Sequence, residues 1–162
     1  MQQLEEYVKH IGGSGTWNDV ITEFGKPSLD TPEDLIRILR ISASTLNREY
    51  QFFLYTFAKW MVTIGNPSAF TRYTSPYNRF SEFMSSADAV NVIVNNIPWH
   101  ENTIEIKKNT ESHFTIYYRS KLRLFSLIKG IYAGLAELMG VSVLVRHRAK
   151  GAELTLIDVI VG

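Results

Sequence analysis

The stretch IEIKKNTESHFTIYYRSKL, residues 104–122, decides the fold of this 162-residue chain. Apolar and polar side chains alternate from Ile104 to Lys108 and again from His113 to Tyr118. A repeat of two residues is typical of a β-strand with one buried face, and the polar segment 109–112 between the two runs supplies a turn. We therefore expect a β-hairpin here, formed by the first strands of the chain.

Upstream of the hairpin, apolar residues recur three and four positions apart, which predicts helices. The clearest beginning is Thr31, an N-cap residue that is followed by Pro32 and two acidic residues near the positive end of the helix dipole. The segment between the last two helices, which contains Pro67 and Pro76, is expected to be a loop. The expected helices cover residues 4–11, 15–24, 32–42, 48–64 and about 77–94.

Downstream of the hairpin, the repeat returns to the helical spacing over about residues 122–139. Gly130 and Gly134 lie one turn apart in this predicted helix. Because glycine has no side chain, we expect the helix to approach another surface closely at this point.

Two further strands are expected, over residues 141–146 and 154–161. The predicted fold class is thus α+β, with an N-terminal helical subdomain followed by a ββαββ antiparallel-sheet subdomain. We expect a single domain over residues 1–162, divided into a helical part at about 1–97 and a sheet part at about 98–162.

The composition limits the classes of function. Net charge is +1, so no overall field attracts nucleic acid, and the longest apolar runs are too short for membrane insertion. The chain has no cysteine, which excludes disulfides, thiolate metal sites and cysteine nucleophiles. The N-terminus carries acidic residues where a signal peptide has basic ones. We expect a cytoplasmic protein.

The end of the second strand carries a pair of hydroxyl groups. Tyr118 and Ser120 lie two residues apart, so they point to the same side of a strand and could hold a polar ligand. The other interpretation is that the two side chains only cap the end of the strand. The residues alone leave both interpretations open.

Several segments, taken in order, resemble the haem-nitric oxide/oxygen binding (H-NOX, also HNOB) family. They are Gly15-Thr16-Trp17, the run 57–62 (FAKWMV), Phe83-Met84, and Tyr118-x-Ser120, the start of the family's Tyr-x-Ser-x-Arg motif. The resemblance implies a haem held between the helical half and the ββαββ half, with that motif on its propionates. Leu122 stands where the family has arginine, so the group able to pair with a propionate is missing.

The resemblance also locates the iron ligand of the family. The family pattern Asn-Leu-Asp-x-Leu-His falls on residues 86–91, which places Asn91 where the family has its histidine. No histidine occurs between His10 and His100, so no shift of register restores one. Asparagine is a poor iron ligand, whereas haem proteins use His, Cys, Met or Tyr. We therefore expect no haem bound in the family's usual way.

The resulting hypothesis is a non-enzymatic sensory or regulatory domain. Its pocket is expected either to be collapsed or to hold an apolar ligand such as a lipid, with Asn91, Tyr118, Ser120 and Leu122 around it. Signalling proteins of the cyclase, kinase or chemoreceptor type are the partners that the resemblance implies. No metal site is expected, because no His-x-x-x-His or Glu-x-x-His spacing occurs.

The main alternative is a true haem-based sensor of nitric oxide or oxygen with a non-standard axial ligand. His100, which follows the helix that carries Asn91, is the first candidate for that ligand, and a tyrosine is the second. An enzyme is the third class considered. No nucleophile elbow frames the Ser, His and Asp residues of the chain, so we expect no catalytic activity.

Overall fold

The computed structural model describes residues 1–98 and 103–162. The N-terminal part is helical and the C-terminal part alternates strands with one helix. The elements are α1 (Gln2–Gly12), α2 (Thr16–Phe24), α3 (Pro32–Thr45), α4 (Tyr50–Trp60), a π-helical turn η1 (Met61–Gly65), α5 (Ser68–Thr74), α6 (Phe80–Met84), α7 (Asp88–Asn96), β1 (Thr103–Thr110), β2 (His113–Arg119), α8 (Phe125–Leu138), β3 (Val143–Ala149) and β4 (Leu154–Val161).

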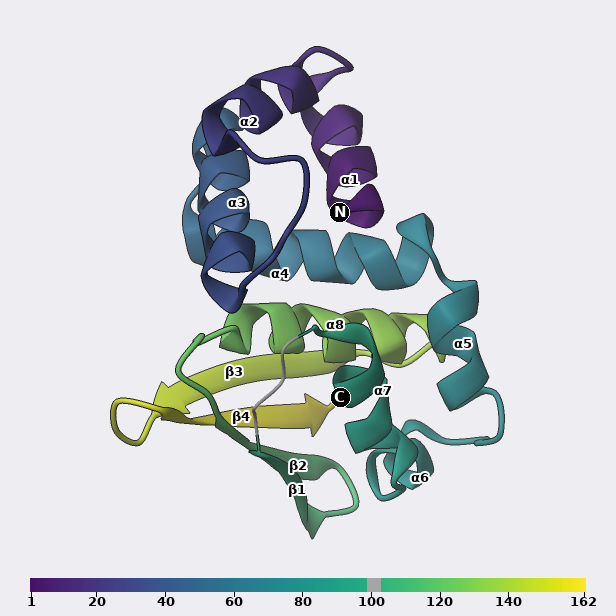
Figure 1. Cartoon of the computed structure of the whole chain (residues 1–162). Coiled ribbons are helices and arrows are strands. Elements are labelled where there is room, and N and C mark those ends of the chain that lie inside the picture. Colours follow the sequence, from purple (N-terminus) through teal and green to yellow (C-terminus); the bar gives the residue numbers. More distant parts are fainter. Residues whose placement is uncertain (99–102) are drawn as a thin grey trace.

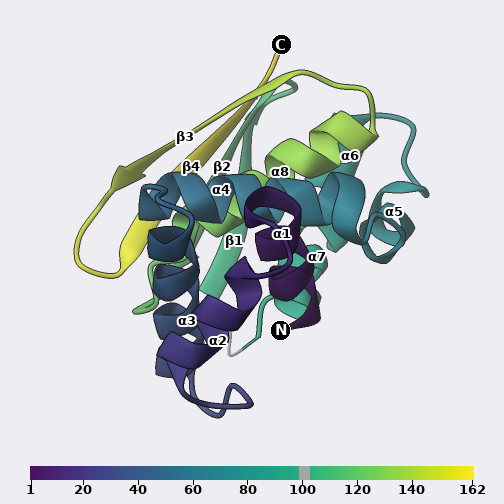
Figure 2. The ribbon, with the colours of Figure 1, turned by 90° about the horizontal axis from the view of Figure 1, so that it is seen from above.

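The elements form two lobes. Helices α1 to α4 make up the upper lobe in Figure 1, the sheet and α8 make up the lower lobe, and α5 to α7 run down one side. Seen from above in Figure 2, α4 lies across α8, so these two helices join the lobes. The order of helices followed by ββαββ confirms the predicted α+β fold class.

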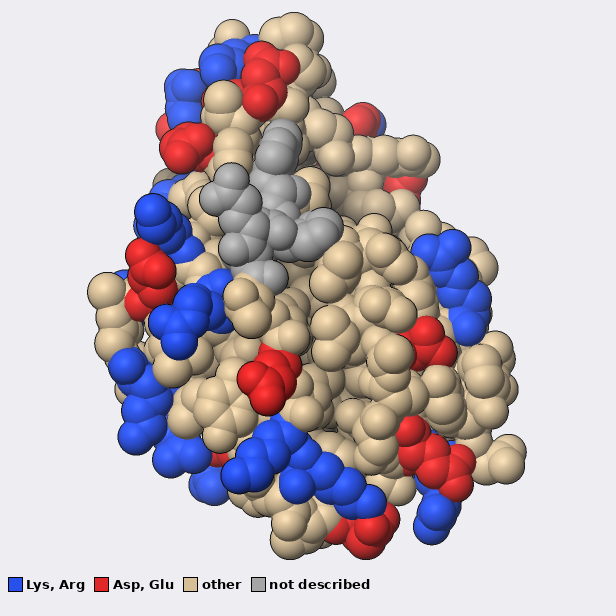
Figure 3. Space-filling view, turned by 60° about the horizontal axis from the view of Figure 1, so that its bottom comes forward, with Lys and Arg blue, Asp and Glu red and all other residues tan. Residues whose placement is uncertain are grey.

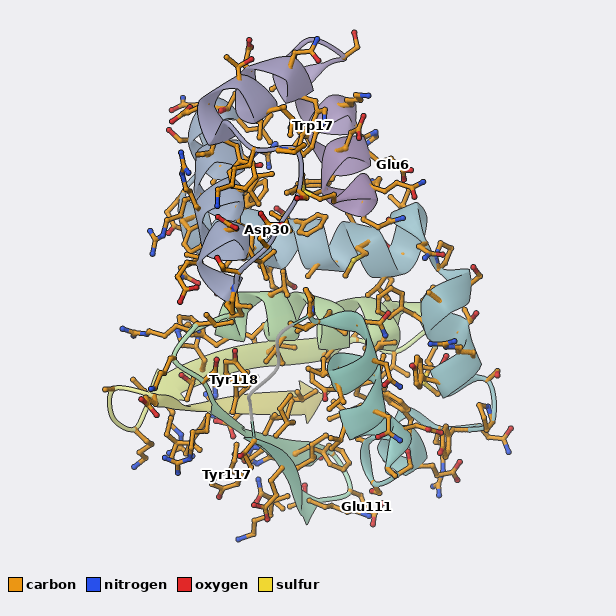
Figure 4. The ribbon with its side chains drawn as sticks, in the orientation of Figure 1. Glu6, Trp17, Asp30, Glu111, Tyr117 and Tyr118 are labelled. Atoms are coloured by element: carbon orange, nitrogen blue, oxygen red, sulfur yellow. The ribbon has the colours of Figure 1, made fainter. Side chains whose placement is uncertain are left out.

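The sheet is antiparallel throughout, with the strand order β1-β2-β4-β3. Phe114, Ile116 and Tyr118 of β2 are buried on the face that carries α8. Tyr117 points to the opposite face, as its separation from Tyr118 in Figure 4 shows. On the face that Figure 3 brings forward, Lys and Arg side chains gather on the left and lower parts, and others lie at the right edge. The predicted hairpin is confirmed, with its turn at residues 111–112.

The predicted start of α3 is confirmed together with its caps. Thr31 Oγ1 accepts a hydrogen bond from the backbone N–H of Asp34 at 3.1 Å, and the Asp34 carboxylate accepts one from the N–H of Thr31 at 3.2 Å. Lys26 Nζ lies 2.8 Å from the same carboxylate. This arrangement satisfies N–H groups that have no partner within the helix, and it fixes where α3 begins.

Replacing Thr31 with alanine is expected to lower the free energy of unfolding by about 1 kcal/mol, because the N-cap acceptor is lost. Urea denaturation followed by circular dichroism measures the change. Thr22→Ala is the matched control, since the Thr22 hydroxyl bonds to Asn18 O within α2 and caps no helix end. An equal loss in both variants would contradict the capping role of Thr31.

The close approach predicted from the glycines of α8 is confirmed. A Cβ atom built on Gly130 would lie 2.3 Å from the carbonyl oxygen of Tyr55 and 2.8 Å from Cβ of Ala58, both in α4. A Cβ atom on Gly134 would lie 2.8 Å from Cβ of Val62. Atoms cannot approach this closely, so both positions require glycine for the two lobes to pack as they do.

The expected continuous helix over residues 77–94 is wrong, because α6 ends at Met84 and α7 begins at Asp88. The hydroxyl groups of Ser85 and Ser86 donate to the backbone oxygens of Ser81 and Phe83. Side-chain bonds of this kind compete with the helical ladder. The break changes the buried face, which α7 forms with Ala89, Val92 and Ile93.

Three smaller differences have local causes. The segment expected as a loop contains α5, and the expected helix 48–64 ends in η1. Helix α8 begins at Phe125 because Arg123 has φ +54°, which no α-helix contains. Strand β3 begins at Val143 because Val141 N still donates to Ala136 O at the end of α8.

Candidate functional site

A small cavity lies where the two lobes meet. It has a volume of about 200 Å³ and receives side chains from α1, α3, α4, η1, α8, the last residue of α7 and the segment that follows it. Most of its lining side chains are apolar. They are Met1, Gln3, Leu4, Leu29, Leu35, Leu39, Phe57, Met61, Asn96, Ile97, Pro98 and Leu127.

Helix α7 does not direct Asn91 into this cavity. The Asn91 side chain is exposed, whereas Ala89, Val92 and Ile93 are fully buried. A residue on the opposite side of a helix from its buried face cannot contact the interior unless the helix rotates. The structure therefore does not bring Asn91 together with the other predicted pocket residues.

Tyr118 is buried between the sheet and the start of α8, and its exposed fraction is 1%. Its hydroxyl oxygen accepts a hydrogen bond from the backbone N–H of Leu124 at 3.3 Å. Burial raises the pKa of the Tyr118 hydroxyl, although contacts with Ser120 and Leu124 act in the other direction. The hydroxyl thus stays protonated and helps to fix the loop between β2 and α8.

Ser120 and Leu122 belong to the same loop. Ser120 is buried, and its Oγ accepts a hydrogen bond from the backbone N–H of Leu122 at 3.0 Å. The Leu122 side chain is half-buried and lines a groove next to the loop instead of the cavity. Of the two interpretations of the hydroxyl pair, the hydrogen bonds in this structure match the capping of the strand end.

Tyr132 of α8 was not predicted from the sequence as part of any site. This residue is fully buried, and its hydroxyl donates a hydrogen bond of 2.5 Å to the carbonyl oxygen of Ala89 in α7. Complete burial raises the pKa of Tyr132, so the hydroxyl remains a donor. The available signal was a tyrosine within a mostly apolar helix, since a buried hydroxyl needs a partner. This bond ties α7 to α8.

Potential metal ligands do not converge within residues 1–98 and 103–162, where no group of three His, Asp or Glu side chains could hold an ion. His100 lies outside the described residues. His113 is half-buried on the sheet, where its Nε2 contacts the Asp158 carboxylate at 2.9 Å. In the described ranges, no helix has the length and hydropathy needed to cross a bilayer.

The fold is an α+β domain of two lobes with a small cavity between them. The sequence model of the haem-NO-binding family, HNOB, matches residues 1–147. The chain therefore belongs to the HNOB, or H-NOX, family, whose members are sensor domains and are not catalytic themselves. No curated protein sequence matches the chain.

Solved structures of the family have the same fold. An H-NOX protein from S. oneidensis in the Fe(II)NO state is 19% identical with a TM-score of 0.80, over 99% of this chain and 96% of that chain. An unliganded Fe(II) H-NOX protein from K. algicida is 13% identical with a TM-score of 0.78, over 99% and 94%. An oxygen-binding H-NOX domain related to soluble guanylate cyclases is 11% identical with a TM-score of 0.75, over 99% and 92%.

The donor atoms around the cavity can be compared with what haem needs. Iron in haem proteins is bound by His, Cys, Met or Tyr. Met1 and Met61 line the cavity, but neither belongs to α7, the helix that carries the family's iron ligand. The buried face of α7 has only Ala89, Val92 and Ile93, and Leu122 has no charge to pair with a propionate. The volume of about 200 Å³ is also below the range of about 300–1,000 Å³ that is typical of ligand pockets. The described residues do not fit haem held through α7.

Proposed function

We propose that this H-NOX domain is a regulatory domain that does not bind haem in the usual way of its family. The observation that carries the proposal is the orientation of α7, which turns Asn91 outward and three aliphatic side chains inward. An iron atom inside the domain would then have no ligand from this helix. Leu122, which stands where the family has arginine, cannot itself pair with a propionate.

The small size of the cavity favours a pocket that is partly collapsed. Phe57, Leu127 and Leu39 are among the side chains that fill the junction of the lobes, and about 200 Å³ remains between them. An apolar cavity of this kind favours a small apolar guest, because apolar surface is transferred out of water. We propose that the guest, if one is bound, is smaller than a porphyrin. A lipid chain would have to enlarge the cavity to enter.

The test is the absorption spectrum of the purified protein, followed by a titration with haemin. We expect no Soret band from a stoichiometric complex, in the protein as purified or after haemin is added. Asn91→His is also expected to restore no stoichiometric haem, because the new imidazole would lie on the exposed side of α7. Asn95→His is the matched control, since Asn95 is exposed on the same helix.

Two results would overturn the proposal. A one-to-one Soret complex of the unaltered protein that is lost in His100→Ala would establish the alternative, a haem-based sensor with a non-standard ligand. Stoichiometric haem in Asn91→His but not in Asn95→His would show that α7 turns toward the cavity. Weak uptake of equal size in both variants would indicate adventitious haemin on surface histidines, and would leave the proposal standing.

H-NOX domains work with signalling proteins such as cyclases and kinases. We propose that this domain likewise regulates a cyclase, a kinase or a chemoreceptor-type protein, in the cytoplasm, and performs no catalysis itself. A net charge of +1 and the absence of cysteine agree with a role that needs neither nucleic acid nor disulfides.

A further inference from the structure

A second and larger hollow lies between the lobes, on the side of α3. It is an open groove of about 810 Å³, within the size range of ligand pockets. One wall comes from α2, α3 and the start of α4, and the other comes from the loop that leads into α8. The groove shares no lining residue with the small cavity. Its lining residues are Glu23, Glu33, Ile36, Arg37, Arg40, Ile41, Tyr50, Gln51, Lys121, Leu122, Arg123 and Phe125.

Basic side chains without an acidic partner line both walls of this groove. Among the described residues, Arg40, Lys121 and Arg123 form no ion pair. The guanidinium carbon of Arg40 lies 4.4 Å from the ring centroid of Tyr50, which holds the planar group in place by a cation–π contact. A fixed guanidinium with free N–H donors is suited to a carboxylate.

The second wall has a backbone conformation that its sequence does not favour. Arg123 has φ +54°, in the left-handed region that costs free energy for a residue with a side chain. The hydrogen bonds of Tyr118 and Ser120 to the N–H groups of Leu124 and Leu122 hold the loop on both sides of it. Strain of this kind is concentrated at ligand sites, where the surrounding structure maintains it.

The groove also contains a buried donor without an acceptor. The hydroxyl of Tyr50 has no hydrogen-bond partner, and burial raises its pKa although Arg40 is near, so it stays protonated. Unsatisfied buried polar atoms are rare in folded proteins. Apolar side chains of Ile36, Ile41 and Phe125 line the same groove. The Arg40 and Arg123 side chains and these apolar side chains therefore line one groove.

We propose that this groove binds a small amphipathic monoanion, namely a carboxylate attached to an apolar or aromatic body. Arg40 and Arg123 would hold the carboxylate from opposite walls, and the body would lie on Ile36, Ile41 and Phe125. Glu23 and Glu33 line the same groove and disfavour a second negative charge on the ligand. The site goes beyond the proposed function, because it does not depend on what fills the small cavity.

Isothermal titration calorimetry with 1-naphthaleneacetate and with its neutral isostere 1-naphthaleneacetamide tests the proposal on the full chain. We expect the acetate to bind at least about tenfold more tightly than the amide, because only the anion makes charge-assisted hydrogen bonds. Arg40→Gln and Arg123→Gly should each weaken the acetate by about tenfold or more and leave the amide unchanged. Lys107→Gln is the control, because it also removes one positive charge, but from an exposed residue of β1 that does not line the groove.

Thermal melting of the variants distinguishes a loss of ligand affinity from a loss of folding stability. Glycine adopts positive φ without strain, so Arg123→Gly is expected to keep or raise the melting temperature while affinity falls. Equal affinity for the acetate and the amide would overturn the proposal. So would unchanged binding in Arg40→Gln and Arg123→Gly, or an equal loss in Lys107→Gln. None of these results depends on the haemin titration.

Discussion

Replacing Gly130 with alanine is expected to destabilise the domain by about 3 kcal/mol, the upper end of what one extra carbon costs in a packed interior. The new Cβ atom would lie 2.3 Å from the Tyr55 carbonyl oxygen, which is a backbone atom and cannot rotate away. Helices α4 and α8 would have to separate along their shared surface. For a domain of this size, the melting temperature measured by circular dichroism should fall by about 6–12 °C.

Gly15→Ala is the control for this substitution. Gly15 has φ −73°, and no atom lies within 4 Å of a Cβ built on it. Alanine there is expected to leave the melting temperature unchanged or to raise it slightly, because it reduces the freedom of the unfolded chain. If Gly130→Ala melts at the same temperature as Gly15→Ala, the two helices do not pack as closely as described.

Removal of the Asp158 carboxylate is expected to have the second largest effect. Only 7% of this side chain is exposed, and it accepts hydrogen bonds from Thr115 Oγ1 at 2.8 Å and from His113 Nε2 at 2.9 Å. Asp158→Ala should lower the free energy of unfolding by about 2–3 kcal/mol, since the buried Thr115 hydroxyl, which still accepts from Asn109 Nδ2, loses the acceptor of its own proton. Arg146 and Arg148 lie 3.9 and 3.8 Å away and are largely exposed, so solvent reduces their contribution.

The effect of Asp158→Ala should depend on pH. Burial alone would raise the pKa of Asp158, but the bonds from His113 and Thr115, with the charge of Arg148, lower it below its usual value. A carboxyl group whose pKa is lower in the folded state stabilises the fold above its unfolded pKa of about 4. This contribution is lost as the pH falls through the folded pKa.

Urea denaturation of the two proteins at neutral pH and at about pH 3 measures the change. The difference in stability between the unaltered protein and Asp158→Ala should be largest at neutral pH and smaller in acid. A difference that grows as the pH falls would show that the carboxylate destabilises the fold, contrary to its hydrogen bonds.

The sequence was most informative where short-range rules decide the structure. The alternation around residues 104–118 predicted the hairpin, Thr31 predicted the start of α3, and the glycines of α8 predicted its close contact. The sequence was misleading where hydrogen bonds from side chains to the backbone interrupt a regular apolar spacing. The apolar spacing runs unbroken across Ser85 and Ser86, yet their hydroxyls end one helix before the next begins.

That Asn91, Tyr118, Ser120 and Leu122 form a ligand site stays a prediction, and none of the four lines the small cavity. Aligned motifs placed Asn91 at the ligand position, yet the exposed side of α7 could be known only after the break before Asp88 was seen. The partners of Tyr118 and Ser120 depend on the path of a loop with a residue at positive φ, which no propensity predicts. The groove joins residues that are more than eighty positions apart in the chain, such as Arg40 and Arg123.

The direct backbone contact at Gly130 constrains how the two halves of the molecule can move. Side chains can change rotamer and absorb a displacement, whereas a carbonyl oxygen against a glycine has nothing that can yield. A tilt of α4 is therefore expected to move α8 with it. The sheet packed against α8 would then either move together with α8 or slide against it. Rigid-body displacement of the two helices together is therefore the motion that this contact favours over sliding of one helix on the other.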